Sequence, residues 1–91
     1  MHSLTEEQYS YIEQLANQAL SMSYCDKAEQ IITQIDNLSY QYLGAIRDLI
    51  GRIVTTLKQY YTVQTLEEKE KQAYFIHCDL SSLQFKVINS K

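Results

Sequence analysis

Apolar residues recur at alternating steps of three and four along the middle of the chain, which is the spacing of one face of an α-helix. No proline interrupts this stretch. Two further apolar residues, Leu49 and Val54, widen the face to an arc of about 140°, which is more than one neighbouring helix covers. The pattern therefore predicts a long central helix over residues 40–61. The recurring positions are Leu43, Ile46, Ile50, Ile53, Leu57 and Tyr60.

The N-terminal residues predict an amphipathic helix with small residues on its apolar face. Ser3 and Glu6 have the spacing of a capping box, so a first helix is expected over residues 4–22. Its apolar face includes Ala16 and Ala19, which permit close packing against a second helix.

A second helix is predicted to begin at Asp26, because Glu29 follows three residues later and apolar residues then recur at helical spacing up to Leu38. Polar side chains at residues 36–39 favour bonds to the local backbone, which compete with helix formation. We therefore expect a helix over residues 26–38 and a short break before the central helix. A bent continuous helix fits the spacing almost as well.

The C-terminal third predicts a fourth helix and a tail of undecided structure. Thr65 and Glu68 form a further capping box, and apolar residues then continue at helical spacing, so this helix is expected over residues 65–82. Residues 83–87 also alternate between apolar and polar, as a strand does. The tail over residues 83–91 is thus compatible with helix, with strand and with a segment that orders only on binding.

The composition indicates a single all-α domain over residues 1–91. Two glycines and no proline supply too little turn chemistry for an all-β fold. About four helices in small antiparallel hairpins are the expected architecture. A chain of 91 residues buries only a small core, so we expect modest stability and no deep active-site cavity.

The charge pattern excludes nucleic acid as a partner, because the net charge is −3 and basic residues form no cluster that would neutralise phosphates. The first residues lack the basic and apolar regions of a secretory signal. No apolar run approaches the roughly 20 residues that span a bilayer. We therefore expect a cytoplasmic protein without a membrane span.

Cysteine and histidine are the residues from which a reactive site would be built. His77 and Cys78 are adjacent, so on a helix they point about 100° apart and do not easily share a metal ion. Neither a CxxC nor an HxxxH spacing brings in His2 or Cys25. A cysteine–histidine nucleophile pair would need an oxyanion hole, and no glycine-bearing loop supplies one. We expect two buried, unpaired cysteines, no cofactor, no small-molecule substrate and no enzymatic activity.

Tyrosine is unusually frequent, with eight residues in a chain that has no tryptophan. Three pairs lie close together in sequence, and one member of each is expected to face the core while the other stays outside. The outer members are either partner-binding residues or half-buried boundary residues, and both roles suit tyrosine. The pairs are Tyr9 with Tyr11, Tyr40 with Tyr42, and Tyr60 with Tyr61.

The only two glycines, Gly44 and Gly51, lie seven residues apart on one edge of the central apolar face. Each costs about 1 kcal/mol relative to alanine inside a helix, so the matched pair predicts that another backbone packs closely there. That backbone belongs either to a neighbouring helix of this chain or to a foreign helix in a groove.

The first predicted hairpin resembles a tetratricopeptide unit over about 30 residues. The chain departs from that pattern at Ala19, where the family has an aromatic residue, at Tyr40, where proline often ends the unit, and at Ile50, which replaces a small residue. Arrays of such units need about three units or a partner to bury their faces, and this chain has at most two and a half. The residues that stand at the family's offsets, with Ala19 matching in position but not in residue type, are Ile12, Leu15, Ala16, Ala19, Tyr24, Ala28, Ile32 and Ile35.

A short, acidic chain with an incomplete repeat array is similar to the tetratricopeptide-like co-chaperones of bacterial type III secretion systems. The resemblance implies a cytoplasmic bacterial chaperone that, with a second small helical chaperone, holds the amphipathic helix of a needle subunit in a hydrophobic groove. By the family's geometry the groove would be lined by Glu13, Asn17, Leu20, Arg47, Gly51 and Val54, with Gly44 and Gly51 admitting the client closely.

The alternative is an inhibitor of the immunity or antitoxin type. Such proteins are often small acidic helical bundles that plug a toxin with carboxylates and tyrosines. Here Glu6, Glu7 and Glu13 would act with nearby tyrosines, and binding would weaken steeply with salt because charge steers the encounter.

Overall fold

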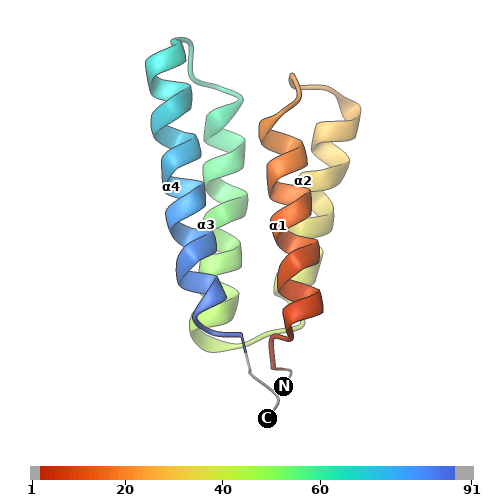
Figure 1. The fold of residues 1–91 in the computed structure, drawn as a ribbon. Helices are drawn as coiled ribbons and strands as arrows, with labels where there is room; N and C mark the ends of the chain where they lie inside the picture. The colour runs from red at the N-terminus through yellow and green to blue at the C-terminus, as the bar shows by residue number, and fades with distance from the viewer. Residues whose placement is uncertain (1–2, 88–91) are drawn as a thin grey trace.

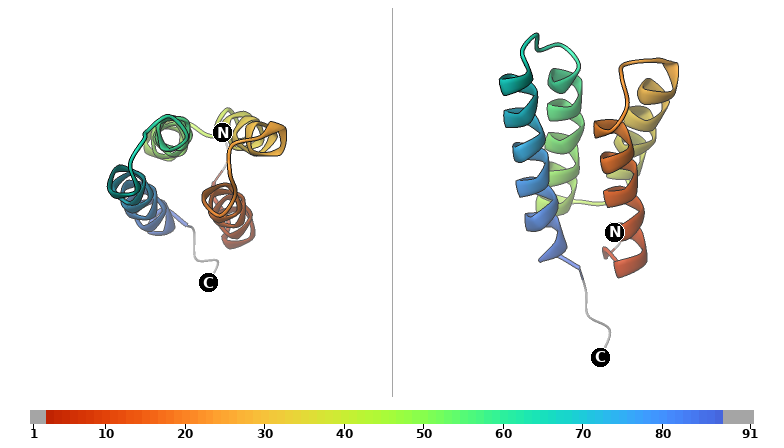
Figure 2. Two further views of the ribbon diagram at one scale, coloured as in Figure 1. Left: turned by 90° about the horizontal axis from the view of Figure 1, so that it is seen from above. Right: turned by 45° about the horizontal axis from the view of Figure 1, so that its top comes forward.

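A computed structural model describes residues 3–87 and shows the expected all-α architecture. Successive helices run antiparallel, so the chain forms two hairpins side by side (Figure 1). Viewed along their axes, the helices follow one another in chain order around a single core (Figure 2). They are α1 (Glu6–Leu20), α2 (Asp26–Ser39), α3 (Gly44–Tyr60) and α4 (Leu66–Gln84).

The predicted central role of α3 is confirmed, since it packs most extensively against α4 and α2 and also touches α1. The small residues expected on the inner face of α1 are buried, since Ala16 and Ala19 of α1 are fully buried, as is Ala28 of α2. A side chain without atoms beyond Cβ permits two helix backbones to approach each other.

The first helix begins two residues later than the sequence indicates. Thr5 is its N-cap: the Thr5 hydroxyl accepts the backbone N–H of Gln8 at 3.2 Å, and the Gln8 side chain accepts the N–H of Thr5 at 3.2 Å. The predicted box of Ser3 and Glu6 is therefore wrong. Leu4, which directly precedes the cap, is fully buried, so its side chain packs in the core while the helix begins only after Thr5.

The cap of the last helix is confirmed, because the Thr65 hydroxyl accepts the backbone N–H of Glu68 at 3.1 Å. The helix continues to Gln84, slightly further than predicted, and residues up to Val87 form a turn that packs against the core. The strand interpretation of residues 83–87 is thus wrong. Residues 88–91 of the tail lie outside the described part of the chain.

The break before the central helix falls later than predicted. The second helix continues through residues 36–38 and ends at Ser39, whose hydroxyl donates to the Asp36 carbonyl at 2.6 Å. Leu43, expected on the apolar face, is the exposed N-cap of α3. In this loop the side chain of Tyr42, and not that of Leu43, is buried in the core.

Two of the three tyrosine pairs divide as predicted. Tyr9 and Tyr42 are buried, whereas Tyr11 and Tyr40 are exposed. The third pair does not divide in this way, because both side chains are half-buried and reach the end of α1. The Tyr60 hydroxyl donates to the Leu20 carbonyl at 3.0 Å, and the Tyr61 hydroxyl donates to the Ala19 carbonyl. The third pair therefore joins the two hairpins.

The two glycines have different roles. Gly44 begins α3 with φ of +66°, a left-handed conformation that a side chain disfavours. Gly51 lies inside the helix with ordinary geometry. A Cβ atom added at either position would meet no other atom within 4 Å. The close backbone contact that the pair predicts is therefore not made within the described residues.

This difference predicts opposite effects of one substitution. Gly51→Ala is expected to raise the free energy of unfolding by about 1 kcal/mol, because alanine is the better helix former and the space is open. Gly44→Ala is expected to lower it by about 1 kcal/mol, because Cβ strains a left-handed backbone. Urea denaturation of both variants tests the pair, and destabilisation by Gly51→Ala would contradict it.

Candidate functional site

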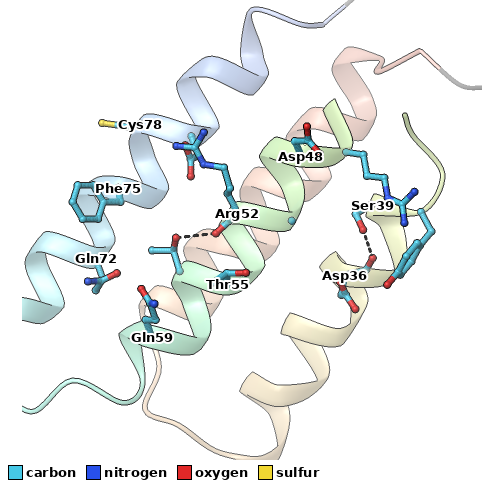
Figure 3. Close-up of a pocket in the computed structure, with 14 residues that line it drawn as sticks. Asp36, Ser39, Asp48, Arg52, Thr55, Gln59, Gln72, Phe75 and Cys78 are labelled. Carbon is cyan, nitrogen blue, oxygen red and sulfur yellow. Dashed lines mark hydrogen bonds and ion pairs between the residues drawn. The ribbon is translucent and has the colours of Figure 1, made fainter. Parts of the chain in front are cut away.

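A groove of about 980 Å³ runs along the outer side of α3 and is bounded by α2 and α4 (Figure 3). Its floor is the polar face of α3, whose residues Asp48, Arg52, Thr55 and Gln59 recur at helical spacing. Gly51 lies among them and leaves open space above the backbone. The walls include Asp36, Ser39 and Tyr40 of α2 and Gln72, Phe75, Cys78 and Asp79 of α4.

The most unusual group in the groove is the carboxyl of Asp79, whose side chain is only 8% exposed. Its Oδ1 forms an ion pair with Nη2 of Arg52 at 3.1 Å, and this pair links α3 to α4. The Arg52 side chain is 69% exposed, so water screens the interaction. Burial raises the pKa of Asp79 above its ordinary value, and the guanidinium opposes that effect only in part.

The raised pKa predicts how stability depends on pH. The folded chain keeps the Asp79 proton to higher pH than the unfolded chain does. The stability that the protonated carboxyl provides is therefore full below pH 3.8, the ordinary pKa of aspartate, and is lost as the pH rises through the folded-state pKa. Asparagine has no proton to lose, so the free energy of unfolding of Asp79→Asn, measured relative to that of the parent, should rise between about pH 3 and pH 7. Urea denaturation across that range measures the difference.

Arg52→Gln is the matched test of the same pair. It should lower the free energy of unfolding at neutral pH by about 1 kcal/mol, because the buried carboxylate loses its ionic partner. The decline of stability with rising pH should then be steeper than in the parent. The free energies of unfolding of Asp79→Asn and the parent could instead differ by the same amount at every pH. That result would show that the Asp79 carboxyl does not titrate as proposed.

The remaining polar groups of the groove offer both donors and acceptors. The guanidinium of Arg47 lies over the Tyr40 ring, 4.8 Å from its centroid. Asp36 and Asp48 form no ion pair among residues 3–87. Oε1 of Gln72 is buried without a hydrogen-bond partner in the same part of the chain. The groove can thus exchange hydrogen bonds with a polar or charged segment and pack an apolar one against Tyr40 and Phe75.

Only some of the sequence-predicted site residues come together. Arg47 and Gly51 line the groove, while Gly44 is exposed at the start of the same helix. Val54 is buried in the core, so its side chain does not face the surface. On α1, Leu20 packs partly against the core and Asn17 is exposed. Glu13 lies there too, accepting a long hydrogen bond of 3.5 Å from the Tyr9 hydroxyl.

The groove also holds residues that the sequence analysis missed, above all those of α4. Asp79 gave the clearest signal, because it lies three residues after Ile76 and four before Leu83, both of which are fully buried. A charge at a core-facing helical position is unusual unless it is paired. Phe75 and Cys78 carried no comparable signal, since neither interrupts the pattern.

The cysteines correct another expectation. Cys25 and Cys78 are both exposed, whereas the sequence analysis placed them in the core. Cys25 is the N-cap of α2. Cys78 lies on the outer side of α4, and the residues of this turn that face the bundle are Ile76, Asp79 and Leu80. No group of three metal-ligating side chains is found within residues 3–87, and His2 lies outside that range.

Within the described residues, none of the helices has the length and apolar character that crossing a membrane requires. Comparison of the chain with protein-family models, with curated proteins and with solved structures found no match.

Proposed function

We propose that this protein is a non-enzymatic chaperone that binds an amphipathic helix of another protein in the groove along α3. The observation that supports this best is the open space above Gly51, which lets a foreign helix approach the backbone of α3. Exposed aromatic rings at Tyr40 and Phe75 flank that position and suit the apolar face of such a helix.

In its narrower form, the proposal makes the client a needle subunit of a bacterial type III secretion system, held in the cytoplasm together with a second small helical chaperone. The tetratricopeptide-like spacing of the first hairpin supports this form. Under it, the α1 residues Glu13, Asn17 and Leu20 would contact the client or the second chaperone, beside the groove itself.

A bulky side chain on the groove floor tests the proposal. Gly51→Leu should weaken binding of a synthetic peptide from the C-terminal helix of a needle subunit at least about tenfold, or 1.4 kcal/mol, because leucine fills the approach. The fold should persist, since the added Cβ meets no atom within 4 Å. Calorimetric titration measures the affinity, and circular dichroism checks the fold.

The matched control is Ala45→Leu, which adds the same side chain at an exposed position of the same helix outside the groove. Its affinity for the peptide should equal that of the parent. Equal binding by all three proteins would show that the groove is not the binding site. Failure of the parent to bind would refute the narrower, secretion-specific form.

The inhibitor alternative also has an observation in its favour. Glu7 and the exposed Tyr11 share the wall of a smaller hollow of about 220 Å³ on α1, which places a carboxylate next to an aromatic ring. Salt separates the two functions. Affinity that falls steeply with sodium chloride would favour the acidic inhibitor, and weak salt dependence would favour apolar packing in the groove.

A further inference from the structure

The outer face of α4 carries no exposed charge over more than three helical turns. Between Lys71 and Lys86 the only charged residue is Asp79, which is buried against the bundle. Surface helices normally carry charge on their outer side, and depletion of charge together with enrichment of aromatic rings marks the centre of protein interfaces. The exposed residues of this stretch are Tyr74, Phe75, His77, Cys78, Ser81, Ser82, Gln84 and Phe85.

Four of these residues form a single line along the helix. Tyr74, Cys78, Ser81 and Phe85 are separated by four, three and four positions, so they lie on one face. Phe85 follows the last helical residue, but its backbone N–H still bonds to the Ser81 carbonyl at 3.4 Å and keeps it in helical phase. Tyr74 is 65% exposed and Phe85 is 89% exposed.

The spacing of this line reads the same in both directions. When two such helices pack antiparallel about a two-fold axis, Tyr74 of one copy meets Phe85 of the other. Cys78 then meets Ser81, so small side chains face each other at the centre and aromatic rings face each other at both ends. Such self-complementarity is what an interface between two identical subunits requires. Small central residues let the helices approach, and the terminal rings pack edge to face or offset.

We propose that the outer face of α4 binds a second copy of this chain, with the two α4 helices antiparallel. No like charges oppose each other across this contact, because the face holds none. The inference goes beyond the proposed function and does not rest on it. The line of four residues shares only Cys78 with the wall of the groove, and its other three members lie outside the groove.

The exposed area indicates a dimer of low affinity. A fully buried aromatic side chain covers about 150–250 Å², so the exposed parts of Tyr74 and Phe85 supply roughly 300 Å² per copy. Both copies together supply about 600 Å² from the rings, which is well below the roughly 1,200 Å² of a stable interface before the small residues are added. We expect a dissociation constant in the micromolar range.

Sedimentation equilibrium between about 10 µM and 1 mM tests the proposal. The weight-average mass of the parent should rise with concentration from 10.6 kDa towards twice that value. Ser81→Glu, which puts a charge at the centre of the face, should weaken the dimer at least about tenfold. The control Ser10→Glu changes the net charge equally at an exposed position of α1 and should behave like the parent.

A parent that stays monomeric throughout this range would overturn the proposal. A dimer that Ser81→Glu leaves intact would also overturn it, because the contact would then lie elsewhere. The antiparallel register has its own test in a mixture of Ser81→Glu with Cys78→Lys. Each variant alone should dimerise at least about tenfold more weakly than the parent, whereas the mixture should form heterodimers more readily than either variant dimerises, since the new glutamate faces the new lysine. Absence of heterodimers would contradict the pairing of Cys78 with Ser81.

Discussion

Ile53→Ala is expected to lower the free energy of unfolding by about 2–5 kcal/mol, a large fraction of the stability of so small a domain. Ile53 is fully buried on α3, the helix that packs most extensively against its neighbours. The variant loses the transfer energy of the removed carbons and leaves a cavity that the surrounding helices fill only in part. Small domains have little stability in reserve, so the melting temperature should fall by more than about 10 °C.

Thermal and urea denaturation followed by circular dichroism measure this effect. The matched control is Thr55→Ala, which shortens an exposed side chain two residues further along the same helix and should change stability by less than about 0.5 kcal/mol. Equal effects of the two variants would mean that α3 does not present Ile53 to the core.

The double substitution Tyr60→Phe with Tyr61→Phe is expected to lower the free energy of unfolding by about 2 kcal/mol. Carbonyl groups in the last turn of a helix have no partner within the helix. In α1 the carbonyls of Ala19 and Leu20 accept the tyrosine hydroxyls, and the carbonyl of Ala19 also accepts the backbone N–H of Met22 at 3.4 Å. Phenylalanine keeps the ring packing, so the variant isolates the two hydrogen bonds.

Tyr24→Phe is the control for this loss. The Tyr24 hydroxyl donates to Glu29 at 2.8 Å, but both side chains are exposed and water can replace the bond. The control should therefore stay within about 0.5 kcal/mol of the parent. Alkaline pH offers a second readout of the Tyr61 hydroxyl. Burial raises the pKa of Tyr61, so the stabilisation it provides is full below pH 10 and is lost as the pH rises through the folded-state pKa.

The helices were predictable because burial on one side imposes a period that the sequence displays. The apolar face of α3 and the cap at Thr65 are local features, and the structure has both. The errors occur where two residues compete for one role. Ser3 and Thr5 are both good caps, and only the burial of Leu4 decides between them. Likewise Tyr42 rather than Leu43 enters the core.

The groove was less predictable than the fold, because its walls come from three helices and their relative placement is not a local property. Gly51 was singled out from its position on the edge of the apolar face, and it does lie on the groove floor. Gly44 occupies the same edge of the apolar face in sequence, but a glycine is needed there because the backbone is left-handed at the start of the helix. Phe75 and Cys78 join the groove only through the way α4 packs beside α3.

The short connections between antiparallel helices also bear on how fast the chain folds. Each hairpin closes over few residues, which keeps the entropy lost on closure small and favours rapid formation of each hairpin on its own. The tyrosine bonds to α1 join residues 40 and 42 positions apart, so they form only after the second hairpin has met the first. Amide hydrogen exchange should accordingly be faster at the end of α1 than in the middle of α3.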